Sequence, residues 1–511
     1  MNRAGAIKKV TLGKEVELRE LMAVARYFAH VGFNEDYKKR VTDCRNLVEQ
    51  FVKENRRIYG ITTGVGDNVK RVIPESEATT YQENILLSHC TTVGEPMDTE
   101  GIRAIMFVML TNMGSGYSGV RLILLDTIAA MLNQKVTPWA PQHGSVGYLG
   151  VEAHIALVIL GKGRAYYDGR LMSGDEAMKK AGIETLRLSY KEGLCLVSGC
   201  TSPTALGALA LYDAQNALAA ADAIASLTLE AVCGNMKAFD KRVMSVKRQP
   251  DQWKSADNLR KLLADSRLIN EAGGINLQDA LSIRCIPQAH GAARKTLKDA
   301  QESIENELNS CDDNPIIHPS GEAMSACNAD AGFTGIASDS MAIAACYLAK
   351  ISERRTDRML NEHISGLPAF LVASPGENSG YMIVQYSSAG ILGEMRVLAH
   401  PASIDAVPTC AMQEDYTSMG YNAALKARKV IGLLEYVLGN ELLTAVQALE
   451  LRKNKELPLS KNSDEIIAAV REKVTFMEKD HYIYPEMEWT KGLVHSGRVR
   501  AISEKNIGEM L

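Results

Sequence analysis

The 511-residue sequence lacks the marks of an exported or membrane-spanning protein. Its ten cysteines, spread from Cys44 to Cys410, include no C-x-x-C pair, which favours reduced thiols and a cytoplasmic location, and no metal site is predicted. The N-terminus has no apolar signal-peptide core. No apolar run is expected to span a membrane, because even the Ala-rich stretch after Pro203 carries Asp213 and Glu230. A net charge of −4 gives no bulk attraction to nucleic acid or to anionic lipid.

Proline is scarce as well, at 15 residues, so long apolar stretches are free to form unbroken helices. Residues 204–232, 336–355 and 422–451 are rich in Ala and Leu and carry apolar side chains at helical spacing. Such nearly all-round apolarity is typical of helices buried inside a bundle. The sequence therefore predicts an all-α fold with a central bundle of long helices.

Short glycine-rich segments, such as 60–66 and 144–150, separate the predicted helices. Loops held on a rigid helical scaffold are where catalytic side chains usually lie. The predicted organisation is a loop-bearing N-terminal region with both segments (1–200), a long-helix core (201–420) and a helical C-terminal region (421–511).

Four motifs carry side chains suited to chemistry on a small charged substrate. They are Tyr59-Gly60-Ile61-Thr62-Thr63-Gly64-Val65-Gly66, Asn84-Ile85-Leu86-Leu87-Ser88-His89, Ser282-Ile283-Arg284-Cys285-Ile286-Pro287-Gln288 and Gln413-Glu414-Asp415. Taken singly, the tyrosine could be a packing residue, the histidine a core residue, and the arginine and glutamate parts of a solvated surface. In combination the motifs resemble those of the histidine and aromatic amino acid ammonia-lyases, and the likeness extends over nearly the whole chain.

The resemblance implies a fold and a set of roles. The fold would be the helical architecture shared with the fumarase and aspartase group, assembled as a homotetramer whose active sites draw on more than one subunit. Tyr59 would remove the β-proton of the substrate, although a phenol with an ordinary pKa near ~10 does so only where its environment favours the phenolate. Arg284 would bind the substrate carboxylate as a planar, always charged, bidentate donor. Glu414 and His89 would contact an imidazole-type ring, because the Ser-His pair resembles the histidine-directed branch.

One motif departs from the family. The family's G-S-V-G is followed by Ala-Ser-Gly, which cyclises into an electrophilic methylidene-imidazolone, whereas in this chain Gly144–Gly147 leads directly to Tyr148. Positions that line the ring in the family are also changed, at Ser198, Leu281 and Ala329. We therefore expect the electrophile to be absent and the enzyme to use no cofactor.

A quaternary ammonium needs no such activation, because it has no lone pair to alkylate and is already a good leaving group. The predicted reaction is elimination of trimethylamine from a histidine betaine by acid/base catalysis, as in the ergothionase type, which converts ergothioneine to thiourocanate. Tyr148 and Asp330 are candidates for holding the trimethylammonium group through cation–π and charge attraction. The predicted catalytic residues are Tyr59, Glu414 and Arg284, and the predicted substrate-binding residues are His89, Gln278, Asn328, Asp330, Tyr148, Ser198 and Met382.

Two other interpretations stay open. The first is a histidine ammonia-lyase, which makes urocanate and ammonia, with its Ala-Ser-Gly-derived ring left out of the written sequence. The second is a catalytically inactive homologue that binds a histidine derivative or assembles with partners. Retention of Tyr59, Arg284 and Glu414 together argues against an inactive protein.

Overall fold

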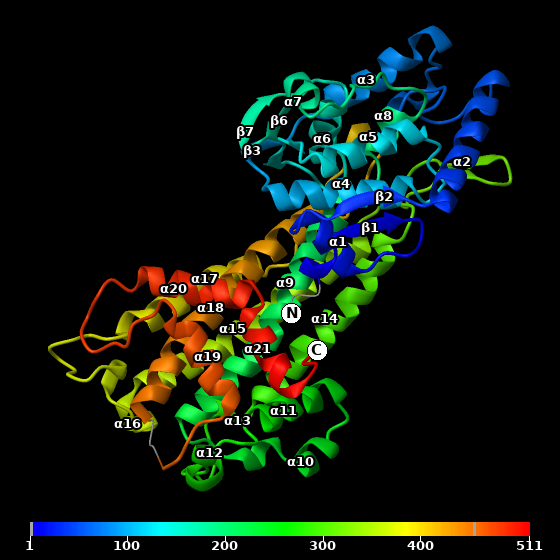
Figure 1. Cartoon of the computed structure of the whole chain (residues 1–511). Helices are drawn as coiled ribbons and strands as arrows, with labels where there is room; N and C mark the ends of the chain where they lie inside the picture. The colour runs from blue at the N-terminus through cyan, green and yellow to red at the C-terminus, as the bar shows by residue number, and fades with distance from the viewer. Residues whose placement is uncertain (1–3, 453–455) are drawn as a thin grey trace.

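Three long helices form the centre of the fold: α9 (Thr201–Ala231), α15 (Gly332–Leu360) and α18 (Gly420–Arg452). The computed structural model describes residues 4–452 and 456–511. In Figure 1 the long helices run diagonally between an N-terminal part, in blue and cyan, and a group of green helices at the opposite end. The all-α prediction is confirmed. The predicted stretches 336–355 and 422–451 lie within α15 and α18, and the stretch 204–232 ends one residue beyond α9.

Helix α9 shows why small apolar residues dominate the centre. All of its residues are buried except Tyr212 and Gln215, and it packs closely against α18 and α15. Alanine lets helix backbones approach one another, and burial on every side requires apolar residues all round. The stretch Glu192–Ala231 is in fact long and apolar enough to cross a membrane, contrary to the prediction, but its most apolar 18-residue window is wholly buried inside the fold.

The remaining helices extend the bundle at both ends. The N-terminal part contains α1 (Leu18–Ala25), α2 (Glu35–Lys53), α3 (Ala78–His89), α4 (Thr99–Met113), α5 (Leu122–Asn133), α6 (Val151–Ile159), α7 (Gly174–Lys180) and α8 (Glu192–Val197). The rest of the chain adds α10 (Lys241–Ser245), α11 (Pro250–Leu262), α12 (Arg267–Ala272), α13 (Leu281–Arg284), α14 (Ile286–Leu308), α16 (Glu362–Ser365), α17 (Met382–Leu398), α19 (Lys461–Arg471), α20 (Tyr484–His495) and α21 (Arg498–Ile507). Helix α14 packs against α15 and α9, and α20 packs against α18. The division of the chain at residues 200 and 420 stays a prediction.

Short strands lie outside the bundle. They are β1 (Lys9–Leu12), β2 (His30–Phe33), β3 (Val93–Pro96), β4 (Thr137–Pro138), β5 (Pro141–His143), β6 (Arg164–Tyr167), β7 (Arg170–Ser173), β8 (Ile316–His318) and β9 (Glu322–Met324). They pair as a parallel β1–β2 ribbon, antiparallel β3–β5 and β8–β9 ribbons, and a three-stranded β4–β6–β7 sheet. The β3–β5 ribbon holds together the segments that follow His89 and precede Gly144.

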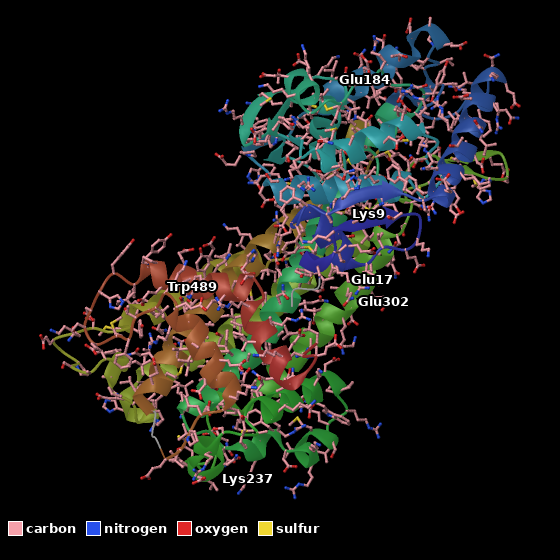
Figure 2. The ribbon with its side chains drawn as sticks, viewed as in Figure 1. Lys9, Glu17, Glu184, Lys237, Glu302 and Trp489 are labelled. Carbon is pink, nitrogen blue, oxygen red and sulfur yellow. The ribbon has the colours of Figure 1, made fainter. Side chains whose placement is uncertain are left out.

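Charged side chains lie on the surface of several parts of the molecule, and the cysteines are unpaired. Glu184, Lys237 and Glu302 project outward from three separate parts of the molecule (Figure 2). All ten cysteines are free thiols. Reduced thiols agree with the cytoplasmic location predicted from the sequence, which stays a prediction.

A buried ion pair ties the central helices together. Glu441 on α18 accepts hydrogen bonds from Arg355 Nε at 2.5 Å and Nη2 at 2.8 Å, and from the hydroxyls of Thr228 (2.7 Å) and Ser352 (2.6 Å). Both charged side chains have no solvent exposure. We expect Glu441→Ala to lower the free energy of unfolding by about 3–5 kcal/mol, because it leaves a buried guanidinium unpaired.

Urea unfolding followed by circular dichroism measures this loss. The control is Asp299→Ala, which breaks the exposed Lys295–Asp299 pair and should change the unfolding free energy by less than about 1 kcal/mol. Equal effects of the two substitutions would contradict a structural role for the buried pair.

Candidate active site

Tyr59 lies in a turn that is closed by its own hydroxyl. The Gly66 amide donates a hydrogen bond to Tyr59 Oη at 2.8 Å, and backbone bonds from Gly64 to Arg71 and from Ile73 to Thr62 brace the loop. The phenol is half-buried. Burial raises its pKa, the Gly66 N–H opposes that rise, and the nearby negative charge of Glu414 adds to it. The free enzyme therefore holds Tyr59 as the protonated phenol at neutral pH.

Glu414 comes to this loop from a distant part of the chain. It follows the short 3-10 helix η6 (Cys410–Met412), and it is held by Thr409, whose hydroxyl donates to Glu414 Oε2 at 3.0 Å and whose amide donates to the Glu414 carbonyl at 2.7 Å. Helix η6 contacts η2 (Gly66–Lys70) beside Tyr59. Gly66 has φ +56°, and a Cβ there would lie 2.5 Å from Cys410 Sγ, so only glycine allows the two segments to meet this closely.

Tyr148 joins the group from the glycine-rich loop before α6. Its hydroxyl lies close enough to Glu414 for the charge of that carboxylate to act on it. Burial, followed by the charges of Glu414, Cys327 and Asp330, raises the pKa of Tyr148 well above the usual range. Tyr148 thus stays a neutral donor, and Tyr59 and Tyr148 both lie near one carboxylate.

Asp330 supplies a second acidic group close to Tyr148. One of its oxygens accepts a hydrogen bond from the Gly332 amide at 2.8 Å, at the start of α15. The exposed Tyr416 also lies near Asp330, whose negative charge is the main cause of a raised Tyr416 pKa. Asn328, two residues earlier, is exposed and donates to the Cys311 carbonyl at 3.3 Å. Tyr416 was not predicted, although it stands only two residues after Glu414.

Ser198 and His89 lie on the elements that surround the Tyr148 loop. Ser198 is buried directly after α8, and the neighbouring Val197 carbonyl accepts a hydrogen bond from the Leu149 amide at 3.2 Å. His89, half-buried, ends α3, and its Nδ1 lies 2.7 Å from the Ile85 carbonyl. Because a carbonyl can only accept, Nδ1 carries the proton in this hydrogen bond.

Arg284, Gln278 and Met382 are not brought to the Tyr59 group within one chain. Arg284 ends α13, where its Nε donates to the Asp279 carbonyl at 3.0 Å, and Gln278 is exposed just before it. Figure 1 places α13 at the end of the molecule opposite α3 and α8. Met382 begins α17, and among the described residues no hydrogen bond or ion pair links it to Tyr59. A single chain therefore assembles only part of the predicted site.

Comparison with known proteins identifies the family. A model of the aromatic amino acid lyases matches residues 16–472. The chain belongs to the aromatic amino acid lyase family. It is 42% identical to a histidine ammonia-lyase of Caldanaerobacter subterraneus subsp. tengcongensis, over 97% of this chain and 98% of that protein. This aromatic amino acid lyase is accordingly an enzyme, a carbon–nitrogen lyase.

Solved structures agree with this assignment. The histidine ammonia-lyase of Trypanosoma cruzi superposes with a TM-score of 0.92 at 31% identity, covering 98% of this chain and 96% of that chain. The ergothioneine-degrading ergothionase of Treponema denticola superposes with a TM-score of 0.90 at 27% identity, covering 96% and 99%. Sequence identity is thus higher to the histidine ammonia-lyases than to ergothionase.

These relatives correct the prediction of a cofactor-free enzyme. Histidine ammonia-lyases make methylidene-imidazolone autocatalytically from Ala-Ser-Gly, so family membership implies the electrophile and overturns its expected absence. One of the substitutions on which that expectation rested is also weak evidence. Leu281 is 60% exposed on α13, far along the molecule from the Tyr148 loop of the same chain, so its identity says little about that loop.

The loop itself differs from the family motif. Gly147 is followed directly by Tyr148, and Ala-Ser-Gly occurs nowhere in the 511 residues. A Cβ on Gly147, where φ is +152°, would lie 2.8 Å from Ser418 Oγ. The loop thus lacks the precursor tripeptide, while family membership implies the group. The roles proposed for the side chains of this chain involve no step on it.

The neighbouring carboxylate predicts a pH effect. Because the charge of Glu414 raises the pKa of Tyr59, we expect Glu414→Gln to lower that pKa, so that the phenolate forms at lower pH. Phenolate absorbance, titrated with pH and corrected by subtracting the matching Tyr59→Phe protein, measures the midpoint. Asp415→Asn is the control, since this exposed neighbour is not among the groups that shift Tyr59. An unchanged or higher midpoint in Glu414→Gln would contradict the electrostatic coupling.

Proposed function

We propose that this aromatic amino acid lyase acts on L-histidine and releases ammonia and urocanate. The observation that supports the proposal is its identity of about 40% to histidine ammonia-lyases over the whole length of both chains. Retention of the Ser88-His89 pair and of Glu414 agrees with a substrate that carries an imidazole ring.

The chemistry follows from the side chains. Tyr59, after losing its own proton to become the phenolate, takes the β-proton. The C–H electron pair becomes the new double bond, and the Cα–N bond breaks so that the substrate's ammonium group leaves as ammonia with that electron pair. Glu414, with His89, holds the imidazole and draws electron density into the ring, which acidifies the β-proton. Arg284 binds the carboxylate through two parallel hydrogen bonds.

Because Arg284 lies far from Tyr59 within one chain, a second copy must supply it. We propose that the enzyme is a homotetramer whose sites are shared between subunits. An exposed apolar face on α15 supports association, with Phe333 at 71% and Ile336 at 62% exposure. Burying such side chains against another copy stabilises an assembly by about 25 cal/mol per Å² of apolar surface.

A second candidate function is elimination of trimethylamine from a histidine betaine such as ergothioneine. The observation that favours it is the Tyr148, Glu414 and Asp330 group, in which an aromatic ring lies near two carboxylates and one of these, Glu414, also lies near Tyr59. Aromatic faces and acidic groups together are well suited to a quaternary ammonium. The likeness to ergothionase agrees with this candidate, at lower identity.

A substrate panel separates the two candidates. The purified protein is incubated in parallel with L-histidine, its trimethyl betaine and ergothioneine, while ammonia, trimethylamine and the ultraviolet absorbance of the unsaturated product are followed. Ammonia from histidine supports the first proposal, and trimethylamine without ammonia replaces it by the second. Turnover of none of the three would overturn both. The intact mass of the same preparation reports the covalent state of the Gly147–Tyr148 loop.

A further inference from the structure

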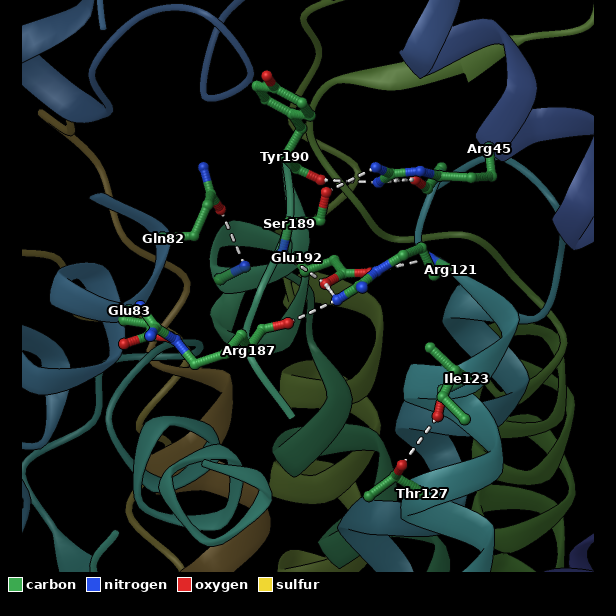
Figure 3. A network of polar contacts seen from close by, with 12 residues as sticks. Arg45, Gln82, Glu83, Arg121, Ile123, Thr127, Arg187, Ser189, Tyr190 and Glu192 are labelled. Carbon is green, nitrogen blue, oxygen red and sulfur yellow. Dashed lines mark hydrogen bonds and ion pairs between the residues drawn. The ribbon is translucent and has the colours of Figure 1, made fainter. Parts of the chain in front are cut away.

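Gln82 links two of the loops that carry candidate catalytic residues. It lies on α3, is 1% exposed, and makes three hydrogen bonds to backbone atoms of other segments. Its Nε2 donates to the Gly60 carbonyl at 3.1 Å, directly after Tyr59. Its Oε1 accepts from the amides of Gly193 at 2.9 Å and Leu194 at 3.2 Å. Figure 3 shows this side chain reaching the first turn of α8 beside Glu192.

The bond to α8 supplies a cap that the helix lacks locally. The first amides of a helix have no partner within it, and a side chain at the N-cap position normally accepts from them. The N-cap of α8 is Lys191, in a left-handed conformation with φ +67°, and it makes no side-chain capping bond. Gln82 accepts from these amides in its place, from a helix more than 100 residues earlier in the chain.

The backbone segments around Gln82 lie so close together that Gly193 and Gly60 have no room for a side chain. A Cβ on Gly193 would lie 2.2 Å from the Gln82 carbonyl oxygen, and one on Gly60, at φ +64°, would lie 2.2 Å from Leu194 Cδ2. Helix α3, the start of α8 and the turn after Tyr59 are therefore in direct contact. A buried amide that satisfies both a carbonyl and two N–H groups leaves no polar group unpaired at this junction.

The other end of α8 leads to the second loop. The Val197 carbonyl, on the last residue of the helix, accepts from the Leu149 amide, next to Tyr148. The six residues of α8 thus connect the turn of Tyr59 with the loop of Tyr148. Arg121 holds the same helix from the other side through a bidentate pair with the buried Glu192, at 2.8 and 2.7 Å (Figure 3).

We propose that Gln82 is a positioning residue that fixes Tyr59 relative to α8 and the Tyr148 loop. The inference rests on the proposed role of Tyr59 as base. Gln82 itself touches no substrate, so its loss should lower kcat while leaving KM within about twofold. A displacement of the base by about 1 Å is enough to lower the rate roughly 10- to 100-fold.

The test compares Gln82→Met with Gln447→Met. Gln447 is a matched control: it is fully buried on α18, it donates to the carbonyls of Leu371 (3.1 Å) and Met477 (3.2 Å), and it accepts from the Met477 amide (3.1 Å) and Arg471 (2.9 Å). Both substitutions keep side-chain volume and remove a buried amide, so both should lower stability. Only Gln82→Met should lower kcat and speed amide hydrogen exchange over residues 58–66.

A second, milder variant allows the test even if Gln82→Met does not fold. Gln82→Asn keeps the amide but is one methylene shorter, so it cannot reach Gly60 and α8 together, and the same two changes should follow in smaller degree. Exchange over residues 58–66 that matches the parent in both Gln82 variants would overturn the inference. This readout needs no turnover, so it is separate from failure of the proposed function, which would show as an inactive parent protein.

Discussion

Replacing Tyr59 with phenylalanine is expected to lower kcat by roughly 100- to 10,000-fold, the usual contribution of a positioned general base. The substitution removes one oxygen. Its hydrogen bond from the Gly66 amide is lost, but the ring still packs against the core. Substrate binding should persist, because the side chains assigned to the carboxylate and the imidazole are untouched. Steady-state kinetics on the best substrate of the panel measures kcat and KM separately.

Tyr37→Phe provides the control for loss of a tyrosine hydroxyl. Tyr37 is fully buried and donates to the Leu110 carbonyl at 2.8 Å, in the N-terminal part but outside the Tyr59 group. Its loss should cost about 1 kcal/mol of stability and leave kcat unchanged. If Tyr59→Phe retained more than a tenth of the parent kcat, or if Tyr37→Phe lost as much, Tyr59 would not be the base.

Arg284→Gln is expected to lower kcat/KM by roughly 100-fold or more, because leaving a buried carboxylate without its charged partner costs about 2–5 kcal/mol. Arg284→Lys should recover only part of this loss, since an ammonium cannot make the two parallel bonds of a guanidinium. The position of Arg284 adds a stronger expectation. Because α13 lies at the opposite end of the molecule from Tyr59, the proposed shared site predicts that the Tyr59→Phe and Arg284→Gln defects reside in different subunits of one site.

Co-expressing the two inactive variants should therefore restore activity. If chains mix at random and each site takes Tyr59 from one subunit and Arg284 from another, roughly a quarter of the sites regain both residues. Co-expressed Tyr59→Phe and Glu414→Gln chains are the control, since these residues meet within one chain and cannot complement. A mixed Tyr59→Phe and Arg284→Gln oligomer that is no more active than its parents would contradict the shared site.

The long helices could be predicted because their signal is local. The helices α9, α15 and α18 are specified by Ala and Leu at helical spacing with little proline. This signal does not depend on how the rest of the chain is folded. The resemblance assigned Tyr59 and Glu414 to one active site, and the structure brings Glu414 near both Tyr59 and Tyr148, with Asp330 near Tyr148. Their catalytic roles stay predictions.

Other parts of the site had no sequence signal. Gln82 is one glutamine on an ordinary helix, and nothing in its neighbourhood shows that its amide will meet Gly60 and the start of α8. The exposure of Leu281 was likewise invisible, because the resemblance assigns it to a site without saying which subunit contributes it. Packing between distant segments decides both, and spacing along one sequence does not record it.

The contact between η2 and η6 also determines how much of the chain must be synthesised before the active site can form. Tyr59 and Glu414 are 414 − 59 = 355 positions apart, and the segment with Glu414 precedes α18, the last long helix of the bundle. During synthesis the Tyr59 turn leaves the ribosome long before its carboxylate, so the nascent N-terminal part carries a base without its partner. A chain that stops before residue 410 can have no complete site, whatever helices it has formed. The site can therefore become active only late in synthesis, when the segment that contains Glu414 has packed against the turn that contains Tyr59.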